Sequence, residues 1–200
     1  MLSDVERSVY NACMNSDTQS LDPLPPRERI LVAAHGLFYR DGIRATGVDR
    51  IIDRSMVSKV TFYRQYASKD ELIKAYLDYR HQGWMCWFNS SLMQHSRDGA
   101  GAAAALVRTL GDWFGQSDFR GCAFLNAAAE LGSADPAILE MVRRHKNEMA
   151  GVLDALFARD AVCAGQRLSL AVDGAIVHAQ MGQPLDEVLE NFKAVVERIV

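Results

Sequence analysis

Apolar residues recur at helical spacing along most of the chain. From Arg27 onward, a first stripe places apolar side chains at i, i+3, i+4, i+7 and i+8, namely Ile30, Ala33, Ala34, Leu37 and Phe38. This spacing puts them on one face of a helix. Gly42 is expected to end that helix, because glycine readily adopts the conformation found at helix C-termini. No alternating pattern of the strand type persists in the sequence, so the chain is predicted to be all-α.

Three hydroxyl residues mark further helix starts within two dozen residues. Thr46 is expected to cap a helix that ends near Arg54, and Ser58 to cap the next one. Ser68 and Glu71 match a capping box, in which each side chain bonds a backbone amide near the other. Two very short helices followed by the start of a third are typical of a helix-turn-helix that docks in the DNA major groove.

The remaining pattern predicts a longer helical region. A fourth helix is expected over 69–93, and Gly, Pro, Ser or Asp clusters separate later helices at 102–116, 121–131, 136–159, 165–181 and 184–199. Residues 1–25 lack sustained periodicity and end in a proline-rich stretch, which indicates a flexible arm. The predicted organisation is an arm at 1–25, a three-helix helix-turn-helix DNA-binding domain at 26–68, and a helical ligand-binding and dimerisation bundle at 69–200.

Charge is unevenly distributed along the chain. The whole chain carries a net charge of −3, yet residues 27–80 hold eleven Lys and Arg against seven Asp and Glu. Residues 81–200 hold ten basic against fourteen acidic residues, and residues 1–26 hold one against four. The basic excess therefore surrounds the predicted helix-turn-helix, as the neutralisation of DNA phosphates requires.

The second short helix carries side chains suited to reading DNA. Lys59 or Arg64 could reach guanine, and Val60 could touch a thymine methyl group. Tyr63 is flanked by polar donors and is interpreted as a DNA contact, whereas Phe62 is interpreted as an anchor in the core. The helix starts at Thr46 and Ser68 add backbone amides that favour phosphate binding.

Residues 27–80 resemble the DNA-binding domain of the TetR family of transcriptional regulators. The matching residues are Leu37-Phe38, Asp41-Gly42, Ala45-Thr46, Ile51-Ile52, Val57-Ser58-Lys59, Thr61-Phe62-Tyr63 and Ser68-Lys69. The resemblance implies a homodimer whose recognition helices enter successive major grooves, and a C-terminal domain that senses a small molecule. It implies phosphate contacts from Thr46, Tyr63 and Lys69, and positions at or near the bases for Ser58, Lys59, Val60, Thr61 and Arg64.

Met56 departs from the family pattern, because it stands where glycine is usual in the turn between the two short helices. A left-handed methionine there would cost about 1–2 kcal/mol. Either the turn differs from that of the family, or the packing of neighbouring Val57 and Phe62 offsets the strain.

Aromatic and polar residues beyond the helix-turn-helix are candidates for a small-molecule pocket, since such pockets combine apolar walls with a few polar groups. Asn126 and Glu130 are i, i+4 neighbours in an apolar run and are the favoured polar contacts for an aromatic or amphipathic ligand. Cys122 is interpreted as a buried structural cysteine, with a redox- or electrophile-sensitive thiol as the alternative. The candidate ligand residues are Trp84, Trp87, Phe88, Trp113, Cys122, Asn126, Glu130 and His145.

The last two predicted helices have broad apolar faces with several small residues. Such faces suit a four-helix interface between two copies of the chain. The predicted dimer interface consists of Leu168, Val172, Ala175, Ile176, Leu185, Leu189, Phe192 and Val196.

These patterns predict a ligand-responsive, sequence-specific transcriptional regulator, a repressor that a small organic effector releases from its DNA operator. The alternatives are an all-helical enzyme or an interaction module without specific DNA binding, and an architectural DNA-binding protein without an effector. The sequence contains no HExxH, GxSxG or phosphate-cradling glycine loop, so we expect no catalytic residues, metal or cofactor. The lack of a membrane-spanning apolar run or signal peptide, and four cysteines without a CxxC pair, favour a cytoplasmic protein with reduced thiols and no membrane partner.

Overall fold

The computed structural model describes residues 24–97, 99, 101–158 and 163–200, and these residues form helices without strands. The helices are α2 (Pro26–Asp41), α3 (Val48–Ser55), α4 (Lys59–Gln65), α5 (Lys69–Arg97), α6 (Gly101–Phe114), α7 (Ala123–Leu131), α8 (Pro136–Leu156), α9 (Gly165–Gln180) and α10 (Leu185–Ile199). Their bounds lie within a few residues of those predicted, so the all-α prediction is confirmed. The predicted arm lies almost wholly outside the described residues.

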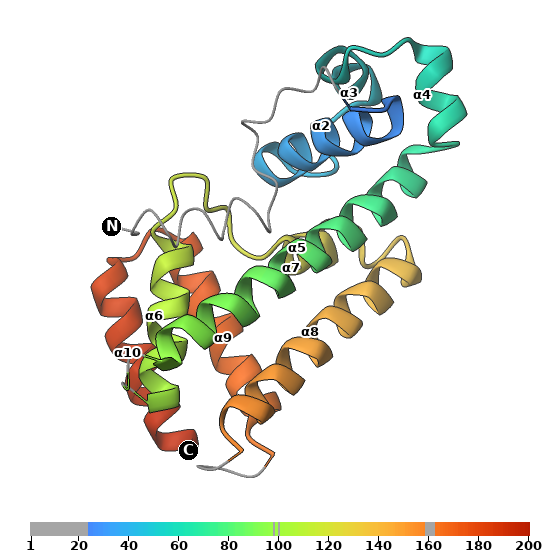
Figure 1. The fold of residues 1–200 in the computed structure, drawn as a ribbon. Helices are drawn as coiled ribbons and strands as arrows, with labels where there is room; N and C mark the ends of the chain where they lie inside the picture. The colour runs from blue at the N-terminus through green and yellow to red at the C-terminus, as the bar shows by residue number, and fades with distance from the viewer. Residues whose placement is uncertain (1–23, 98, 100, 159–162) are drawn as a thin grey trace.

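The short helices lie at one end of an elongated molecule (Figure 1). Helices α2, α3 and α4 pack together there, and α5 runs from this end into the rest of the structure. Helix α8 runs beside α5, while α6, α9 and α10 gather at the opposite end. Because α5 packs against α2, α6, α7 and α8, it connects the two ends of the molecule.

Helix α2 begins and ends where its sequence predicts. Pro26 occupies the first turn, where its missing amide hydrogen costs no helical hydrogen bond. Gly42 ends the helix with a φ of +91°, and its amide donates to the Phe38 carbonyl over 3.1 Å. The apolar stripe from Ile30 to Phe38 is buried against α3, α4 and α5.

Two of the three predicted helix caps are present. Ser58 Oγ accepts from the Thr61 amide at 3.1 Å, and Ser68 Oγ accepts from the Glu71 amide at 3.1 Å. The Glu71 carboxylate reaches back to the Ala67 amide at 2.9 Å, which completes the predicted box one residue earlier than expected. These bonds satisfy amides that the first turn of a helix leaves without partners.

The third predicted cap is wrong, because α3 begins at Val48 with Gly47 as its N-cap. Thr46 is buried, and its hydroxyl donates to the carbonyls of Gly42 at 2.7 Å and Leu37 at 3.4 Å. The side chain therefore fastens the end of α2 to the corner before α3. Its hydroxyl faces the protein, which corrects the expectation that it would hold a DNA phosphate.

A single buried apolar cluster extends from α2 to α10. Along α5, Tyr76 and Leu77 belong to it near α2, while Trp84 and Phe88 belong to it near α6. Protein interiors are close-packed, so a shift of a side chain in one part of such a core is felt by its neighbours. The core thus provides a physical connection between the helix-turn-helix and the larger bundle.

Candidate DNA-reading surface and buried aromatic cluster

Helix α4 presents one face to the core and the other to solvent. Phe62 is fully buried, which confirms its predicted role as an anchor. The predicted DNA contacts on the same helix and its cap are exposed at Ser58, Lys59, Val60, Tyr63 and Arg64, with Thr61 half-buried. Val60 is 78 % exposed, although burial of a valine would be favourable. The structure therefore brings these candidate contacts together on one outer surface.

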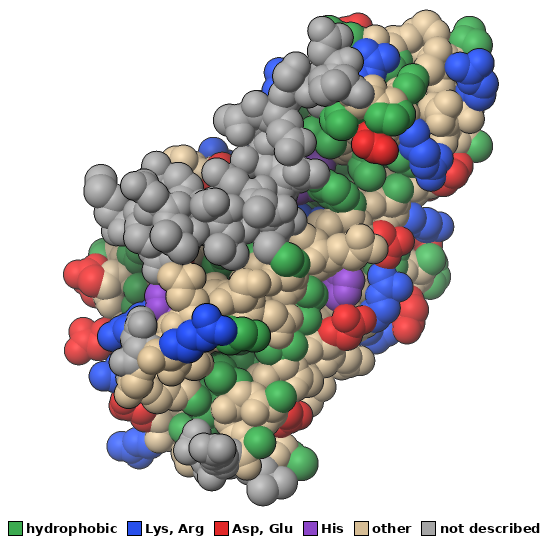
Figure 2. All heavy atoms as spheres, in the orientation of Figure 1, with side chains coloured by type: hydrophobic (Ala, Val, Ile, Leu, Met, Phe, Trp, Pro, Cys, Tyr) green, Lys and Arg blue, Asp and Glu red, His purple; other side chains and the backbone are tan. Residues whose placement is uncertain are grey.

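The ion pair that Lys59 forms at this surface is weak. Lys59 Nζ lies 3.6 Å from the Asp49 carboxylate, and both side chains are mostly exposed. An exposed pair of this kind contributes at most about 1 kcal/mol, so a phosphate or a base can replace it. Figure 2 shows Lys and Arg side chains on the outer surface of the end that holds α3 and α4.

The turn between α3 and α4 passes through a left-handed residue. Met56 has φ 53° and ψ 42°, and its amide donates to the Asp53 and Ile52 carbonyls. The turn thus keeps a left-handed geometry that glycine adopts without a steric penalty, and methionine bears the strain. Val57, half-buried against the core, and buried Phe62 fix the segment beyond the turn.

A carboxylate from α7 holds the backbone just before α3. Glu130 accepts hydrogen bonds from the amides of Ile43 at 3.2 Å and Arg44 at 2.8 Å. We call these two bonds the α7 clasp. On the same loop, Lys69 Nζ donates to the Ile43 carbonyl at 2.6 Å. Burial lowers the pKa of Lys69, while the nearby carboxylates of Glu130 and Asp70 oppose that shift.

The α7 clasp changes the interpretation of Lys69 and Gly42. The Lys69 ammonium is already bonded to the protein, so its predicted phosphate contact stays a prediction and would have to share this donor. A side chain at Gly42 would need a strained φ of +91°, and its Cβ would lie 3.5 Å from both Glu130 oxygens. The 3.5 Å spacing would be an ordinary van der Waals contact, so glycine is favoured here by its backbone conformation rather than by lack of space.

Asn126 and Glu130 do not line the cavity of the aromatic interior, and their predicted ligand contacts stay a prediction. The Asn126 amide donates to the Arg120 carbonyl at 3.0 Å and accepts from Gln180 at 3.2 Å. Both residues line a polar cavity that also involves Tyr39 of α2 and the end of α9. As predicted, the two residues lie on one face of α7. This face contacts the helix-turn-helix and α9.

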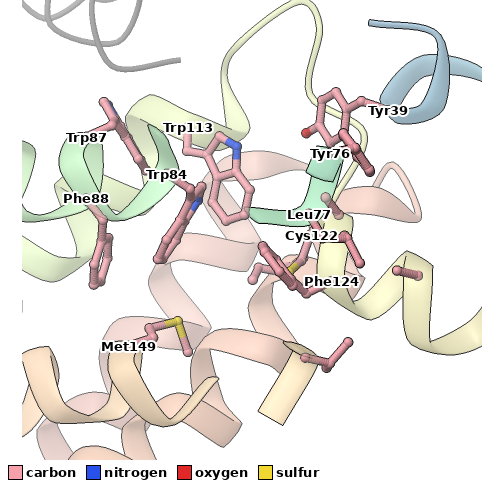
Figure 3. Packing of buried hydrophobic residues seen from close by; sticks show 14 of the residues in the cluster. Tyr39, Tyr76, Leu77, Trp84, Trp87, Phe88, Trp113, Cys122, Phe124 and Met149 are labelled. Atoms are coloured by element: carbon pink, nitrogen blue, oxygen red, sulfur yellow. The ribbon is translucent and has the colours of Figure 1, made fainter. Parts of the chain in front are cut away.

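The other ligand candidates do come together. We call Trp84, Trp87, Phe88, Trp113, Phe124 and His145 the aromatic cluster. Figure 3 labels all of these except His145, and Cys122 lies beside Phe124. Trp84 stacks on Phe88 with ring centroids 4.5 Å apart, and Phe124 stacks on His145 at 3.7 Å. Trp84 and Trp113 meet edge to face at 5.5 Å. Burial, followed by nearby positive charges, holds the pKa of His145 well below its ordinary value, so His145 is neutral.

Cys122 lies at the N-cap of α7 as a buried free thiol, which agrees with its structural interpretation. Cys163 is also free but exposed. Cys86 is disulfide-bonded, so the expectation of reduced thiols is wrong for this residue.

Arg80 and Tyr39 join the aromatic cluster to α2, and the sequence reasoning missed both. The buried Arg80 guanidinium lies over the Tyr39 ring at 4.0 Å and bonds the His35 ring at 3.3 Å. Burial and then Arg80 lower the pKa of His35 to about 3, so its neutral ring accepts from the guanidinium. Tyr39 Oη accepts from the Arg120 amide and donates to the Gly121 carbonyl, both at 3.0 Å. The sequence could have indicated the burial of Arg80, because Arg80 lies four residues before Trp84 on the same face of α5.

The predicted dimer residues pack inside the subunit. Six are buried in the core, namely Leu168, Val172, Ala175, Ile176, Phe192 and Val196, while Leu185 and Leu189 are half-buried against it. Helices α9 and α10 pack on each other and on α8 and α6. Ala175 and Phe192 also line a hollow of about 360 Å³ between α9 and α10, and the assignment of these eight residues to a dimer interface stays a prediction. Other apolar side chains of these two helices are exposed, namely Leu170, Val177, Met181 and Val195.

Comparisons with known proteins agree with this geometry. The family described as bacterial regulatory proteins, tetR family, matches residues 30–76. The crystal structure of SCO4454, a TetR-family transcriptional regulator from Streptomyces coelicolor, is 33 % identical, with 87 % of this chain and 93 % of that chain covered and a TM-score of 0.72. An uncharacterized HTH-type transcriptional regulator in the lacX 3′ region of Lactococcus lactis subsp. lactis is 24 % identical over 179 residues, which cover 83 % of this chain and 89 % of the relative.

The fold and the comparisons define a DNA-binding transcriptional regulator. The chain belongs to the TetR family. Its fold is shared by the multidrug binding protein EbrR in complex with malachite green, at 21 % identity and a TM-score of 0.66, with 87 % of this chain and 97 % of that chain covered. Family and fold thus indicate a regulator rather than an enzyme.

Among the described residues, no helix is both long enough and apolar enough to cross a membrane.

We predict that Met56→Gly stabilises the protein by about 1 kcal/mol, because glycine removes the steric cost of the left-handed turn. Urea unfolding measures this change. The matched control is Met93→Gly, a similarly exposed methionine within α5, which should destabilise by about 1 kcal/mol because glycine is a poor helix residue. A Met56→Gly protein no more stable than the wild type would show that the turn is unstrained.

Proposed function

We propose that this regulator is a dimeric repressor in which residues 26–68 read an operator and residues 69–200 dimerise and bind a small organic effector. The observation that carries the proposal is the outer face of α4, where Lys59, Val60, Tyr63 and Arg64 are exposed around an anchor at Phe62. A helix that is fixed on one side and rich in donors on the other suits insertion into the major groove. The protein would act in the cytoplasm, where bacterial DNA lies.

The outer faces of α9 and α10 support the dimer. Leu170 and Val177 on α9, and Met181 directly after that helix, repeat at helical spacing, and Val195 of α10 is also exposed. An exposed apolar patch of this kind commonly marks an interaction surface. A second copy of the chain is the proposed occupant, because two-fold symmetry would pair each patch with itself and place two α4 helices about one DNA turn, roughly 34–36 Å, apart.

The aromatic cluster supports the effector site. It is the large aromatic interior between α5, α6, α7 and α8, and Arg80 and Cys122 line its small cavity. The EbrR complex shows that a protein of this fold is known to bind an organic molecule. Enclosed sites with apolar walls and few polar groups are typical of small-molecule binding.

The α7 clasp supports a route from effector to DNA. Cys122 and Phe124, at the start of α7, line the cavity of the cluster, and Glu130, near the end of α7, holds the loop before α3. An effector that opens the cluster would move α7 and thereby release or shift that loop. Favouring the released arrangement by about 2.8 kcal/mol would weaken operator binding 100-fold.

We predict that selection from random DNA recovers an operator with two half-sites about one helical turn apart, bound more weakly as salt rises. Arg64→Ala and Lys59→Ala should each cost about 1–3 kcal/mol at particular base pairs, because a lost side chain no longer discriminates those bases. Gel shifts on the selected operator and its single-base variants measure this. Lys193→Ala, an exposed lysine on α10, is the control and should bind like the wild type.

The rival functions give different results in the same experiment. An architectural DNA protein would bind with little preference for any selected sequence. An enzyme or interaction module would show no steep salt dependence of DNA binding. Recovery of no sequence that outcompetes bulk DNA would refute the proposed function.

We predict that Leu170→Glu converts the dimer to monomers, because it places a carboxylate at the centre of an apolar interface. Sedimentation measures the mass in solution. Met93→Glu, which changes a similarly exposed apolar residue on α5, is the control and should leave the dimer intact. A Leu170→Glu protein that remains dimeric would contradict this interface, whereas Phe192, being buried, would report folding instead.

A further inference from the structure

The aromatic cluster contains two buried hydrogen-bond donors without acceptors. Within the described part of the chain, Nε1 of Trp84 and Nε1 of Trp113 have no hydrogen-bond partner, although both indoles are at least 97 % buried. Leaving a buried donor unsatisfied costs about 1–3 kcal/mol. Most buried polar groups in proteins are paired, so two such donors in one cluster indicate an acceptor that binds there.

The other polar groups around the cavity strengthen this conclusion. Both tryptophans line a small cavity together with Arg80, Cys122, Phe124 and others, and the described side chains around it include no carboxylate. Arg80 carries a permanent positive charge, whereas His145, which also lines the cavity, is neutral because burial lowers its pKa. The site therefore offers donors and positive charge but lacks a negative group to bind a cation.

Parallel aromatic pairs at and beside the cavity favour a flat molecule. Trp84 lies parallel to Phe88 within 18°, and Phe124 lies parallel to His145 within 9°. Aromatic rings add to such stacks through offset or edge contacts. A planar aromatic ligand can therefore take the place of one ring in such a stack and keep the ring contacts of the other.

We infer that the effector is a flat aromatic anion, a carboxylate or phenolate, whose oxygen accepts from Trp84, Trp113 and Arg80. This inference rests on the proposed effector site and adds the chemical class of its ligand. The cavity has a volume of about 10 Å³, room for roughly one water molecule, so the ring must enter by separating the stacked side chains. Separation would displace Phe124 on α7 and draw Arg80 away from Tyr39, and so would change two of the contacts that link the cluster to the helix-turn-helix.

Three probes that share one ring system test the charge preference on the DNA-free protein. Isothermal titration calorimetry compares 2-naphthoate, 2-naphthamide and 2-naphthylmethylammonium. The naphthoate should bind about tenfold more tightly than the amide, since hydrogen bonds to a charged acceptor are roughly twice as strong, and the ammonium should bind most weakly. Equal or tighter binding of the ammonium, or binding of none of the three, would overturn the inference.

Conservative variants test the two indole donors. Trp84→Phe and Trp113→Phe keep an aromatic ring but remove the N–H group, and each should weaken naphthoate binding about tenfold. Phe157→Leu is the control, because Phe157 is a buried aromatic residue outside the cluster and outside the cavity lining, and this variant should bind like the wild type. Equal losses in all three variants would show a general packing effect and refute the assigned donors.

The experiment separates this inference from the proposed function. Naphthoate binding without a selectable operator would preserve the ligand class and refute the repressor. A selectable operator with tighter binding of the ammonium would preserve the regulator and refute the ligand class.

Discussion

The α7 clasp is the interaction that relates the two ends of this molecule. Two backbone amides of the loop before α3 share the carboxylate of Glu130, which belongs to the helix that also carries Phe124 into the aromatic cluster. Hydrogen bonds to a carboxylate are shorter and stronger than those between neutral groups. Lys69 holds the carbonyl side of the same loop, so the position of the helix-turn-helix depends on α5 and α7 together.

Because of the α7 clasp, opening the aromatic cluster is expected to change the position of the helix-turn-helix. The cavity contains indole donors of Trp84 and Trp113 to which a ligand could supply an acceptor. Opening the cavity would move Arg80, which contacts α2, and α7, which is bonded to the loop before α3. Packed cores and interfaces switch between discrete arrangements because they deform little continuously. The proposed effector would therefore act by favouring a second arrangement of α7 and Arg80, with no direct contact to the DNA-reading helix.

Local patterns predicted the helices, the burial of Phe62 and the gathering of the tryptophans, because these depend on spacing and on hydroxyl caps within one segment. Glu130 was assigned to a ligand because its real partners lie 86 and 87 residues away along the chain. Periodicity also finds the apolar positions of α9 and α10, Phe192 among them, but it does not tell a face that packs inside the subunit from one that meets another copy. The role of Thr46 was also not predictable from its position before α3, because its hydroxyl bonds a carbonyl at the end of the preceding helix.

The most direct test of the coupling is hydrogen exchange at the amides of Ile43 and Arg44, measured by NMR with and without the selected operator. If the α7 clasp supports the DNA-binding arrangement, operator binding must strengthen it in return, so both amides should exchange more slowly in the complex. In Glu130→Ala, exchange should be fast in both states. Wild-type amides that operator binding leaves unchanged, or equal protection in Glu130→Ala, would contradict the account.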